Sequence, residues 1–466
     1  MGGSLFSSLQ TALSALEAQQ TVLGVTAHNV ANANTPGYAR QQVVLESVPA
    51  PVGIGLGTTP AVGGGVRVAT VQRLTSSFLT QELWSSQAQI GAAQQQTQTL
   101  GQVQALLNEP SSTGLSTMLD AFWNSWQNLA NDPQSMAARQ QVLSAGDAVA
   151  TGLSGLVGQT TQLQAGLNTQ VSSDVRQINS LAGQVASLNG QIAVAAGTGQ
   201  TASDLEDARD ALVGKLSQLV PLRVSQNQDG EFNLTIGTVQ LVAGTQTTKL
   251  LTKPSGAQGM LALSWSGGMP VSLDGGQLGA TLDLRDTVLP SYLGQLNQLA
   301  QGVASAVNTQ HAAGYDLSGK VTGLPFFVAK GGGTLDASTL EVNPTLVVAP
   351  NKLAAAGGPF QGPGDGANAL AIGDLNGSAV VAGATSADFY AALVGQLGSE
   401  TQAAQSSLTN LQNLQQGIQQ QISQISGVSL DAEMTRMVQA QNAYAAAAKV
   451  SASVETMLSA LLSMVQ

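Results

Sequence analysis

The sequence predicts a mainly α-helical protein with a smaller β part in the middle of the chain and paired coiled-coil helices at its two ends. Three observations support this fold class. Apolar residues near both termini repeat in alternating steps of three and four, which is the heptad pattern of coiled coils. Long stretches with helical periodicity occupy most of the remaining chain. After Pro221 the apolar period changes from helical to two, as it does in strands.

Composition limits the classes of partner. At 466 residues the chain is long enough for more than one domain with its own core. Charged residues make up 9%, far below the usual value of about a quarter, and the formal net charge is −11 with no cluster of Lys and Arg. Nucleic acid and anionic membrane are therefore poor partners. The absence of cysteine excludes disulfides and thiolate metal sites.

The N-terminal helix has one apolar seam and ends abruptly. The seam carries a single polar residue, Gln20, among Phe6, Leu9, Leu13, Leu16, Leu23, Ala27 and Val30. Asn side chains compete for backbone hydrogen bonds, Pro disfavours a helical residue before it, and Gly accepts a positive φ. The helix is therefore expected to stop across Asn32, Asn34, Pro36 and Gly37, with extended chain from Tyr38.

Before Pro221 the chain is predicted to contain one extended piece followed by long helices. Residues 63–73 alternate like a strand or hairpin. Helices are expected at residues 76–107, around the aromatic cluster Phe122, Trp123 and Trp126, and at residues 134–196. We interpret the aromatic cluster as a core anchor.

Residues 203–212, SDLEDARDAL, are expected to begin a further helix. Ser203 and Glu206 have the spacing of a capping box, in which each side chain bonds the other residue's amide. Asp204, Asp207 and Asp210 lack the spacing of a calcium loop. We interpret them as acids favoured by the helix dipole rather than as a cation site.

The middle of the chain is predicted to hold a small β unit. Residues 224–236 have a hairpin pattern with the turn at Asp229–Gly230, and strand-like pieces continue to about Leu284. A helix from Asp286 to about Gln310 is expected next. Residues 330–366 are rich in Gly and Pro and are expected to be loop or minor β.

The C-terminal part is predicted to be helical from Ser386, with a break at Gly427 and a last helix from about Leu430. Two seams follow heptad spacing: Leu411, Leu414, Ile418, Ile422 and Ile425 before the break, and Val450, Val454, Met457, Leu461 and Met464 after it. The N-terminal helix cannot bury its seam alone, so we expect it to pair with the C-terminal helix. Because charges are sparse, the outer faces of this pair are expected to pack against other subunits.

Chemical motifs give little support to an enzyme, a cofactor site or a metal site. His28 and His311 lie on separate segments and lack metal-ligand spacing, and no nucleophile motif is present. The N-terminal MGGSLFSSLQ has no signal-peptide pattern, so any export is expected to need no cleaved leader. Lys449 and Glu455 interrupt the last apolar run, so no membrane insertion is expected.

Five segments resemble one family in the order in which that family has them. They are NVANANTPGYARQQ (29–42), GGGVRVATVQRLTSSFLTQEL (63–83), NTQHAAGYDLSGKVTGLPFF (308–327), GANALAIGDL (366–375) and the helix-forming residues 426–465. The sequence resembles bacterial flagellar rod, hook and hook-associated proteins. Its Asn-Thr-Pro-Gly-Tyr-x-Arg-Gln form points to the hook-associated members that join the hook to the filament.

The resemblance implies an architecture and a function. The terminal helices would pair as an inner coiled-coil layer, with an elongated helical rod domain outside them and β domains outermost. The protein would be a structural axial component without enzymatic activity, forming a ring of about eleven copies at the hook–filament junction. Larger members carry an extended outer domain where this chain has only residues 328–366, which argues against a full outer domain.

The implied partners are other flagellar components. They are the hook protein, a second junction protein (hook-associated protein 3), further copies of the chain, and an export chaperone on the C-terminal helix. Export would use the flagellar type III system, which places the protein outside the cell.

The predicted division and the candidate residues follow. Residues 1–36 and 428–466 would form the terminal coiled-coil domain, residues 37–220 and 285–427 the helical rod domain with a variable insert at 328–366, and residues 221–284 the small β unit. The candidate assembly residues are Phe6, Leu9, Leu13, Leu16, Leu23, Val30, Asn32, Asn34, Pro36, Gly37, Tyr38, Arg40, Gln41, Tyr444, Val450, Val454, Met457 and Leu461.

Two alternatives are distinguishable by experiment. The chain could be another axial subunit, a hook or distal-rod protein, although these usually lack the Arg40–Gln41 continuation and the 308–327 segment. It could instead be a secreted surface adhesin, which would require ligand binding by residues 221–385. A secreted hydrolase is disfavoured because no nucleophile–base pair is evident.

Overall fold

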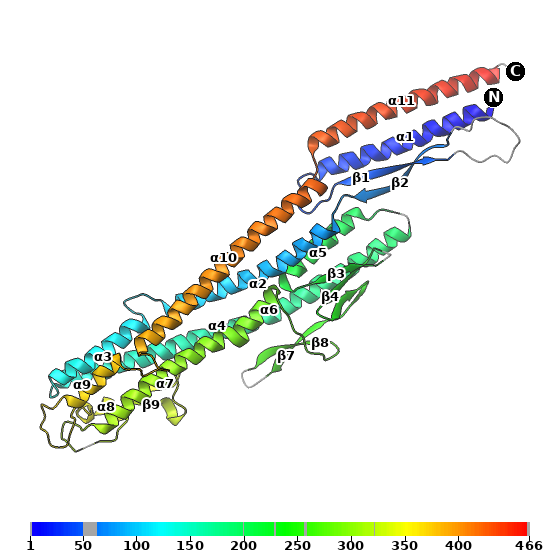
Figure 1. The fold of residues 1–466 in the computed structure, drawn as a ribbon. Coiled ribbons are helices and arrows are strands. Elements are labelled where there is room, and N and C mark those ends of the chain that lie inside the picture. The colour runs from blue at the N-terminus through cyan, green and yellow to red at the C-terminus, as the bar shows by residue number, and fades with distance from the viewer. Residues whose placement is uncertain are drawn as a thin grey trace.

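The computed structural model describes residues 2–49, 63–198, 200–227, 230–255, 259–320 and 322–463. It is an elongated molecule built mostly of long helices, with small β pieces along its sides (Figure 1). Both chain termini lie at one end, and helices α3, α8 and α9 lie at the other (Figure 1). The predicted fold class, mainly α with a smaller β part, is confirmed.

The two terminal helices lie side by side, as the sequence predicts, and they run antiparallel (Figure 1). They are α1 (Gly2–Ala31) and α11 (Leu430–Ser463). A hairpin of β1 (Gln41–Val48) and β2 (Gly65–Arg73) packs on α1, where the amide of Val66 donates to Ser14 Oγ at 3.3 Å. We call α1, β1, β2 and α11 the terminal unit.

Long helices form the body of the molecule, which we call the rod. The helices are α2 (Ser77–Leu107), α3 (Leu115–Asn131), α4 (Met136–Gly197), α5 (Ser203–Leu219), α6 (Gly276–Asp283), α7 (Leu289–Ala313) and α10 (Ser386–Ser426). Local signals mark the ends of α2 and α10. Ser76 Oγ caps α2 by accepting from the amide of Leu79, and Asn108 ends that helix in the left-handed region at φ 49°. The α10 helix stops at Gly427.

Two small β pieces pack beside α4 and α5. A four-stranded sheet has the order β3-β4-β5-β6, and a separate ribbon pairs two further strands. The bounds are β3 (Arg223–Gln226), β4 (Phe232–Ile236), β5 (Val239–Ala243), β6 (Gln246–Thr247), β7 (Leu250–Ser255) and β8 (Met260–Trp265). The predicted hairpin is confirmed, with Gln226 opposite Phe232. Its turn residue Asp229, like Met464 of the last seam, lies outside the described residues.

The prediction that strands continue to about Leu284 is wrong. Residues 276–283 form α6, which continues through a π-helical turn (Leu284–Val288) into α7, so this helix begins ten residues before Asp286. Leu278 and Thr281 are fully buried and Leu284 nearly so, at helical spacing.

The insert at residues 328–366 is compact and packs onto the rod. A short ladder pairs β9 (Phe327–Ala329) with β10 (Leu340–Val342), followed by α8 (Pro344–Val348), and α9 (Ala367–Gly373) follows the insert. Turns of 3-10 helix lie at Lys330–Gly332, Pro350–Lys352 and Asp374–Gly377. The expectation of loop with minor β is therefore correct for most of the insert but misses α8.

Two apolar clusters hold the rod together. The distal cluster surrounds Phe122, Trp123 and Trp126, which are fully buried against Phe326 and Phe327. The core role predicted for this aromatic group is confirmed. The second cluster joins α4 and α5 to the β pieces and includes Trp84, Ile178 and Leu234. Each large apolar side chain buried in this way contributes about 1.5–3 kcal/mol to folding.

Candidate assembly interface

Large apolar side chains are exposed on both helices of the terminal unit. Phe6 is 63% exposed and Leu13 is 48% exposed on α1. On α11 the exposed members are Leu430, Met434, Val438, Tyr444, Val450, Met457, Leu461 and Leu462. Side chains of this size are usually covered, so this surface has the chemistry of an interface between proteins.

The predicted seam residues are only partly used within the chain. Leu9, Leu16, Leu23 and Val30 are half-buried, whereas the buried positions of α1 are Ala12, Ala18, Thr26 and Asn29. On α11 Val454 is buried, but the other predicted seam residues that the structure describes are exposed. The intramolecular pairing thus buries mainly small residues and leaves the larger ones available.

The C-terminal helical residues 386–463 also include an unusually apolar stretch. By length and composition alone, one 18-residue window within residues 386–463 is apolar enough to cross a membrane, and only 11% of that window is buried. An exposed apolar helix is usually buried against another molecule, and we expect that molecule to be a protein.

Residues 27–42 form the joint between α1 and the hairpin, and the predicted break is confirmed. The α1 helix ends at Ala31, and Gly37 has the expected positive φ of 81°. Asn32 closes the last turn, since its amide and side-chain nitrogen both donate to the His28 carbonyl at 3.1 Å. Asn34, Pro36 and Gly37 are exposed, whereas Arg40 is half-buried.

Asn29 is a buried polar hub that the sequence did not reveal. It is 1% exposed, and its side-chain nitrogen donates to the Gln41 carbonyl at 2.9 Å and to Glu433 Oε2 at 3.0 Å. Its Oδ1 accepts from the Gln41 amide at 2.9 Å and from the Tyr38 hydroxyl at 2.8 Å. Asn29 therefore ties α1 to the joint and to α11, with every hydrogen-bonding position filled.

The Tyr38 hydroxyl lies between α1 and several acids. Because it donates to Asn29, its 3.0 Å contact with His28 Nδ1 requires that nitrogen to carry the hydrogen. Burial, together with the negative charges of Asp204, Asp207 and Glu433, raises the pKa of Tyr38 to about 12. The hydroxyl therefore stays neutral and keeps its role as a donor.

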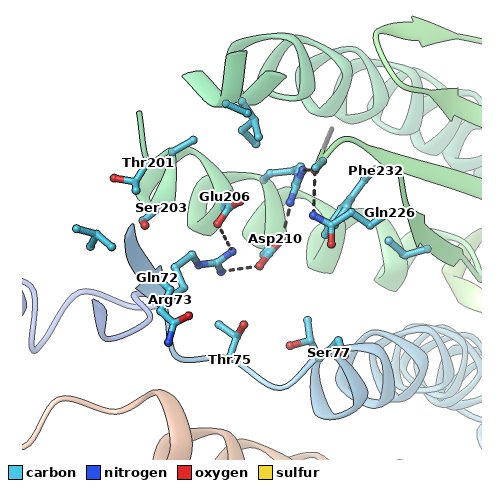
Figure 2. Close-up of a pocket in the computed structure, with 18 of the residues that line it drawn as sticks. Gln72, Arg73, Thr75, Ser77, Thr201, Ser203, Glu206, Asp210, Gln226 and Phe232 are labelled. Carbon is cyan, nitrogen blue, oxygen red and sulfur yellow. Dashed lines mark hydrogen bonds and ion pairs between the residues drawn. The ribbon is translucent and has the colours of Figure 1, made fainter. Parts of the chain in front are cut away.

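The first turns of α5 bind the terminal unit through their acids. Arg73, at the end of β2, is 11% exposed and contacts Glu206 Oε2 at 3.2 Å, Asp207 Oδ1 at 2.6 Å and Asp210 Oδ2 at 2.7 Å. Figure 2 shows the guanidinium between Glu206 and Asp210. Burial raises the pKa of Asp207 and of Asp210, while the charge of Arg73 opposes that rise.

Two further contacts join the joint to the same turns. The Ala39 amide donates to Asp207 Oδ2 at 3.1 Å, and Gln41 Nε2 donates to Asp204 Oδ1 at 3.0 Å. The predicted capping box is wrong, because Ala202 is the N-cap residue and no side chain caps this helix. Of the three aspartates interpreted as acids of the first turn, only Asp204 lies there, together with Glu206, and Asp207 and Asp210 follow further along the helix. These acids also bind a guanidinium and two joint groups.

The contact between Arg73 and the α5 acids was not predicted from the sequence, which carries only one weak sign of it. Glu206, Asp207 and Asp210 share one side of a helix, and Arg73 ends a strand more than one hundred residues earlier. Nothing in the spacing connects the two segments. Among the residues that the structure describes, no group of three or more His, Cys, Asp or Glu could hold a metal ion.

Comparison with known proteins adds sequence evidence. Residues 100–327 match the model of the flagellar hook-associated protein FlgK helical domain. Residues 9–38 match the flagella basal body rod protein model, and residues 419–464 match the flagellar basal body rod FlgEFG protein C-terminal model. The two end matches cover most of α1 and α11.

Relatives match along nearly the whole chain. Flagellar hook-associated protein 1 of Bacillus subtilis strain 168 is 32% identical, with 96% of each chain covered. Its counterpart in Escherichia coli K12 is 28% identical over 98% of this chain and 99% of that one. The structure of the flagellar hook junction protein FlgK from Burkholderia pseudomallei has a TM-score of 0.65 at 19% identity, covering 73% of this chain and 99% of that chain.

Proposed function

The chain belongs to the flagellar hook-associated protein 1 family, and from this premise we propose that it forms the ring that joins the hook to the filament. As a member of this family it is a structural component of the bacterial flagellum and associates with other flagellar components. Membership of a structural family also disfavours an enzymatic role.

The observation that carries the proposal is the exposed apolar surface of the terminal unit. Phe6 and Leu13 on α1 and Val450 and Met457 on α11 are all exposed in the single chain. A second copy that covers them would remove their apolar area from water, which favours association. The sparse charges of the chain leave little repulsion to oppose this contact.

We assign the candidate assembly residues to two groups. Seam residues of α1 and α11 would contact neighbouring copies in a ring of about eleven. Residues 32–41 would hold the terminal unit on the rod, a role supported by the bonds of Ala39 to Asp207 and of Gln41 to Asp204. The division into a terminal domain, a rod and a small β unit is part of the same proposal, with the β1–β2 hairpin counted in the terminal unit and α6 counted in the rod.

The proposed partners and route are those of the family. They are the hook protein on one side, the second junction protein (hook-associated protein 3) on the other, and an export chaperone on α11 before assembly. Secretion would proceed through the flagellar type III system without a cleaved leader. The exposed apolar residues of α11 support the chaperone, because such a surface needs cover before assembly.

Deletion of the gene tests the junction role. Cells without the protein should carry hooks that lack filaments and should shed flagellin into the medium, and a plasmid copy should restore filaments. Normal filaments in the deletion strain would refute the proposal. Immunogold labelling at the hook tip supports the junction ring, whereas labelling along the whole hook would identify a hook subunit.

A further inference from the structure

We propose that Arg73 and the acidic turns of α5 form a clasp that fixes the orientation of the terminal unit on the rod. The clasp consists of Arg73 with Glu206, Asp207 and Asp210. The inference concerns the single chain, so it holds whichever flagellar component the chain forms. Four properties of the contact between the two bodies support it.

First, the chain crosses between the two bodies at only two places. Residues 74–76 connect β2 to α2, and residues 427–429 connect α10 to α11. Both crossings are three residues long and lie outside regular secondary structure. Two short connections limit translation, but they leave rotation about the line that joins them as the easiest motion.

Second, among the residues that the structure describes, no apolar core spans the contact. The buried members of the distal cluster run from Leu100 to Ala404, and those of the second cluster run from Trp84 to Leu278. Neither cluster contains a described residue of the terminal unit. Bodies that share no apolar core are expected to move relative to each other unless other contacts hold them.

Third, charged and polar contacts take the place of a core. The Arg73 side chain is 11% exposed, and it meets Asp207 at 2.6 Å and Asp210 at 2.7 Å. Asp207 also accepts from the Ala39 amide, so one acid holds both β2 and the joint. The four side chains are 11–28% exposed, so removing Arg73 leaves three partly buried carboxylates without their counter-charge, which is unfavourable.

Fourth, hollows surround the clasp. Cavities of about 590, 390 and 350 Å³ lie around it, and each has at least one of the clasp acids in its wall. The largest is the hollow in Figure 2, where Arg73, Glu206 and Asp210 share the wall with Thr75 and Gln226. No tight packing would therefore replace the clasp if its charges were removed, and there is space for movement.

Pulsed electron paramagnetic resonance on the purified full chain tests the clasp. The chain has no cysteine, so the exposed positions Gln184 on α4 and Gln441 on α11 can be changed to Cys and spin-labelled without background. In Arg73→Gln the width of the distance distribution between these labels should at least double. A width equal to that of the labelled parent would overturn the proposal.

Two controls separate joint motion from other effects. Arg67 forms an exposed ion pair with Glu46 inside the hairpin, so Arg67→Gln removes the same charge without touching the contact and should leave the width unchanged. Labels at Gln184 and Gln405, both on the rod, should report the same distance in every variant. If Arg73→Gln disturbs that rod distance, the milder Asp210→Asn decides: a broader joint with an intact rod supports the clasp, and an unchanged joint refutes it.

Discussion

Buried polar side chains in this molecule differ in how completely their hydrogen bonds are satisfied. His311 is fully buried, and its Nδ1 donates to the Leu324 carbonyl at 2.7 Å while its Nε2 accepts from the Ala354 amide at 3.0 Å. Asp174 is 4% exposed, yet its Oδ2 has no hydrogen-bond partner. Burial lowers the pKa of His311 and raises the pKa of Asp174, so the two residues should change the stability of the fold in opposite directions as the pH falls.

His311 should make the protein less stable as the solution is acidified. Burial lowers the pKa of His311 from 6.5 to about 4, so the unfolded chain binds a proton more readily than the folded one. The folded state keeps its full stability above pH 6.5 and loses up to about 3 kcal/mol as the pH falls through this window. Urea unfolding of the parent chain and of His311→Gln at several pH values between 4 and 7 measures this slope.

The variant separates packing from titration. His311→Gln loses ring contacts with Trp126 and Phe326, so it should be less stable than the parent at pH 7. Its free energy of unfolding should nevertheless fall less steeply on acidification, because the titrating group is gone. Equal slopes in the two proteins would show that His311 is not the group that destabilises the fold in acid.

Asp174 should have the opposite effect. Burial raises its pKa to about 6, so its ionised form costs stability at neutral pH, and that cost disappears as the pH falls from about 6 towards 3.8. Asp174→Asn should therefore stabilise the chain by about 1–3 kcal/mol at pH 7.5 and by much less near pH 4. A thermal or urea melt that shows no gain at pH 7.5 would contradict this.

At the scale of residues, the sequence predicted turns and helix ends better than it predicted which side chains contact each other. Gly37, Ser76, Asn108 and Gly427 act as the turn, cap and stop that their chemistry indicates, because such signals depend on a few neighbouring residues. Arg73 and the α5 acids meet only after the chain has folded. Their pairing therefore could not be read from spacing along the chain.

At the scale of elements, long helices were predictable and short ambiguous ones were not. The α2, α3 and α4 helices lie where periodicity places them, because many residues agree on one period. The eight residues of α6 carry too few apolar positions to decide between strand and helix. The partnership of α1 with α11 was predictable because a helix with one apolar seam cannot bury that seam alone.

The terminal unit should be the first element group to be cleaved by a protease. Its helices lie outside both apolar clusters and bury mainly small residues, so local opening costs less there than in the rod. Brief digestion of the monomer with subtilisin, followed by mass spectrometry, should remove parts of residues 1–32 and 430–466 first. Trypsin is unsuitable because the first basic residue is Arg40.

The digestion has a clear contrary result. Early cleavage within α4, with both ends intact, would show that the rod opens before the terminal unit. Assembly should reverse the sensitivity of the ends, because neighbouring copies would cover the exposed residues of α1 and α11. Assembled particles digested in parallel provide that comparison.

At the scale of the whole molecule, the fold separates a rod with buried apolar cores from a terminal unit whose large apolar side chains are exposed. The rod contains both cores, while the terminal unit carries the exposed Phe6, Leu13, Val450 and Met457. The sequence indicated this separation through its heptads and its joint. It did not indicate which face of each helix stays exposed. The two helices pack through small residues such as Ala12 and Ala18, which a search for large apolar residues does not select.

A charge on the open face should block assembly without unfolding the chain. Leu13 is 48% exposed, so Leu13→Glu should change the free energy of unfolding of the monomer by less than about 0.5 kcal/mol. In the assembled ring the same side chain would be covered, and burying an unpaired carboxylate is strongly unfavourable. Cells with Leu13→Glu should therefore secrete the protein but fail to attach filaments, as electron microscopy and motility assays would show.

Gln10→Glu is the matched control for this prediction. Gln10 is exposed on the same helix and lies one heptad before Glu17, on a line of α1 that already tolerates a carboxylate. Gln10→Glu adds the same charge only three residues from Leu13, so cells with this variant should swim normally. If both variants swim, α1 does not contact its neighbours through Leu13, and if neither swims, charge anywhere on α1 blocks assembly. Only the split between them places the interface on the predicted seam.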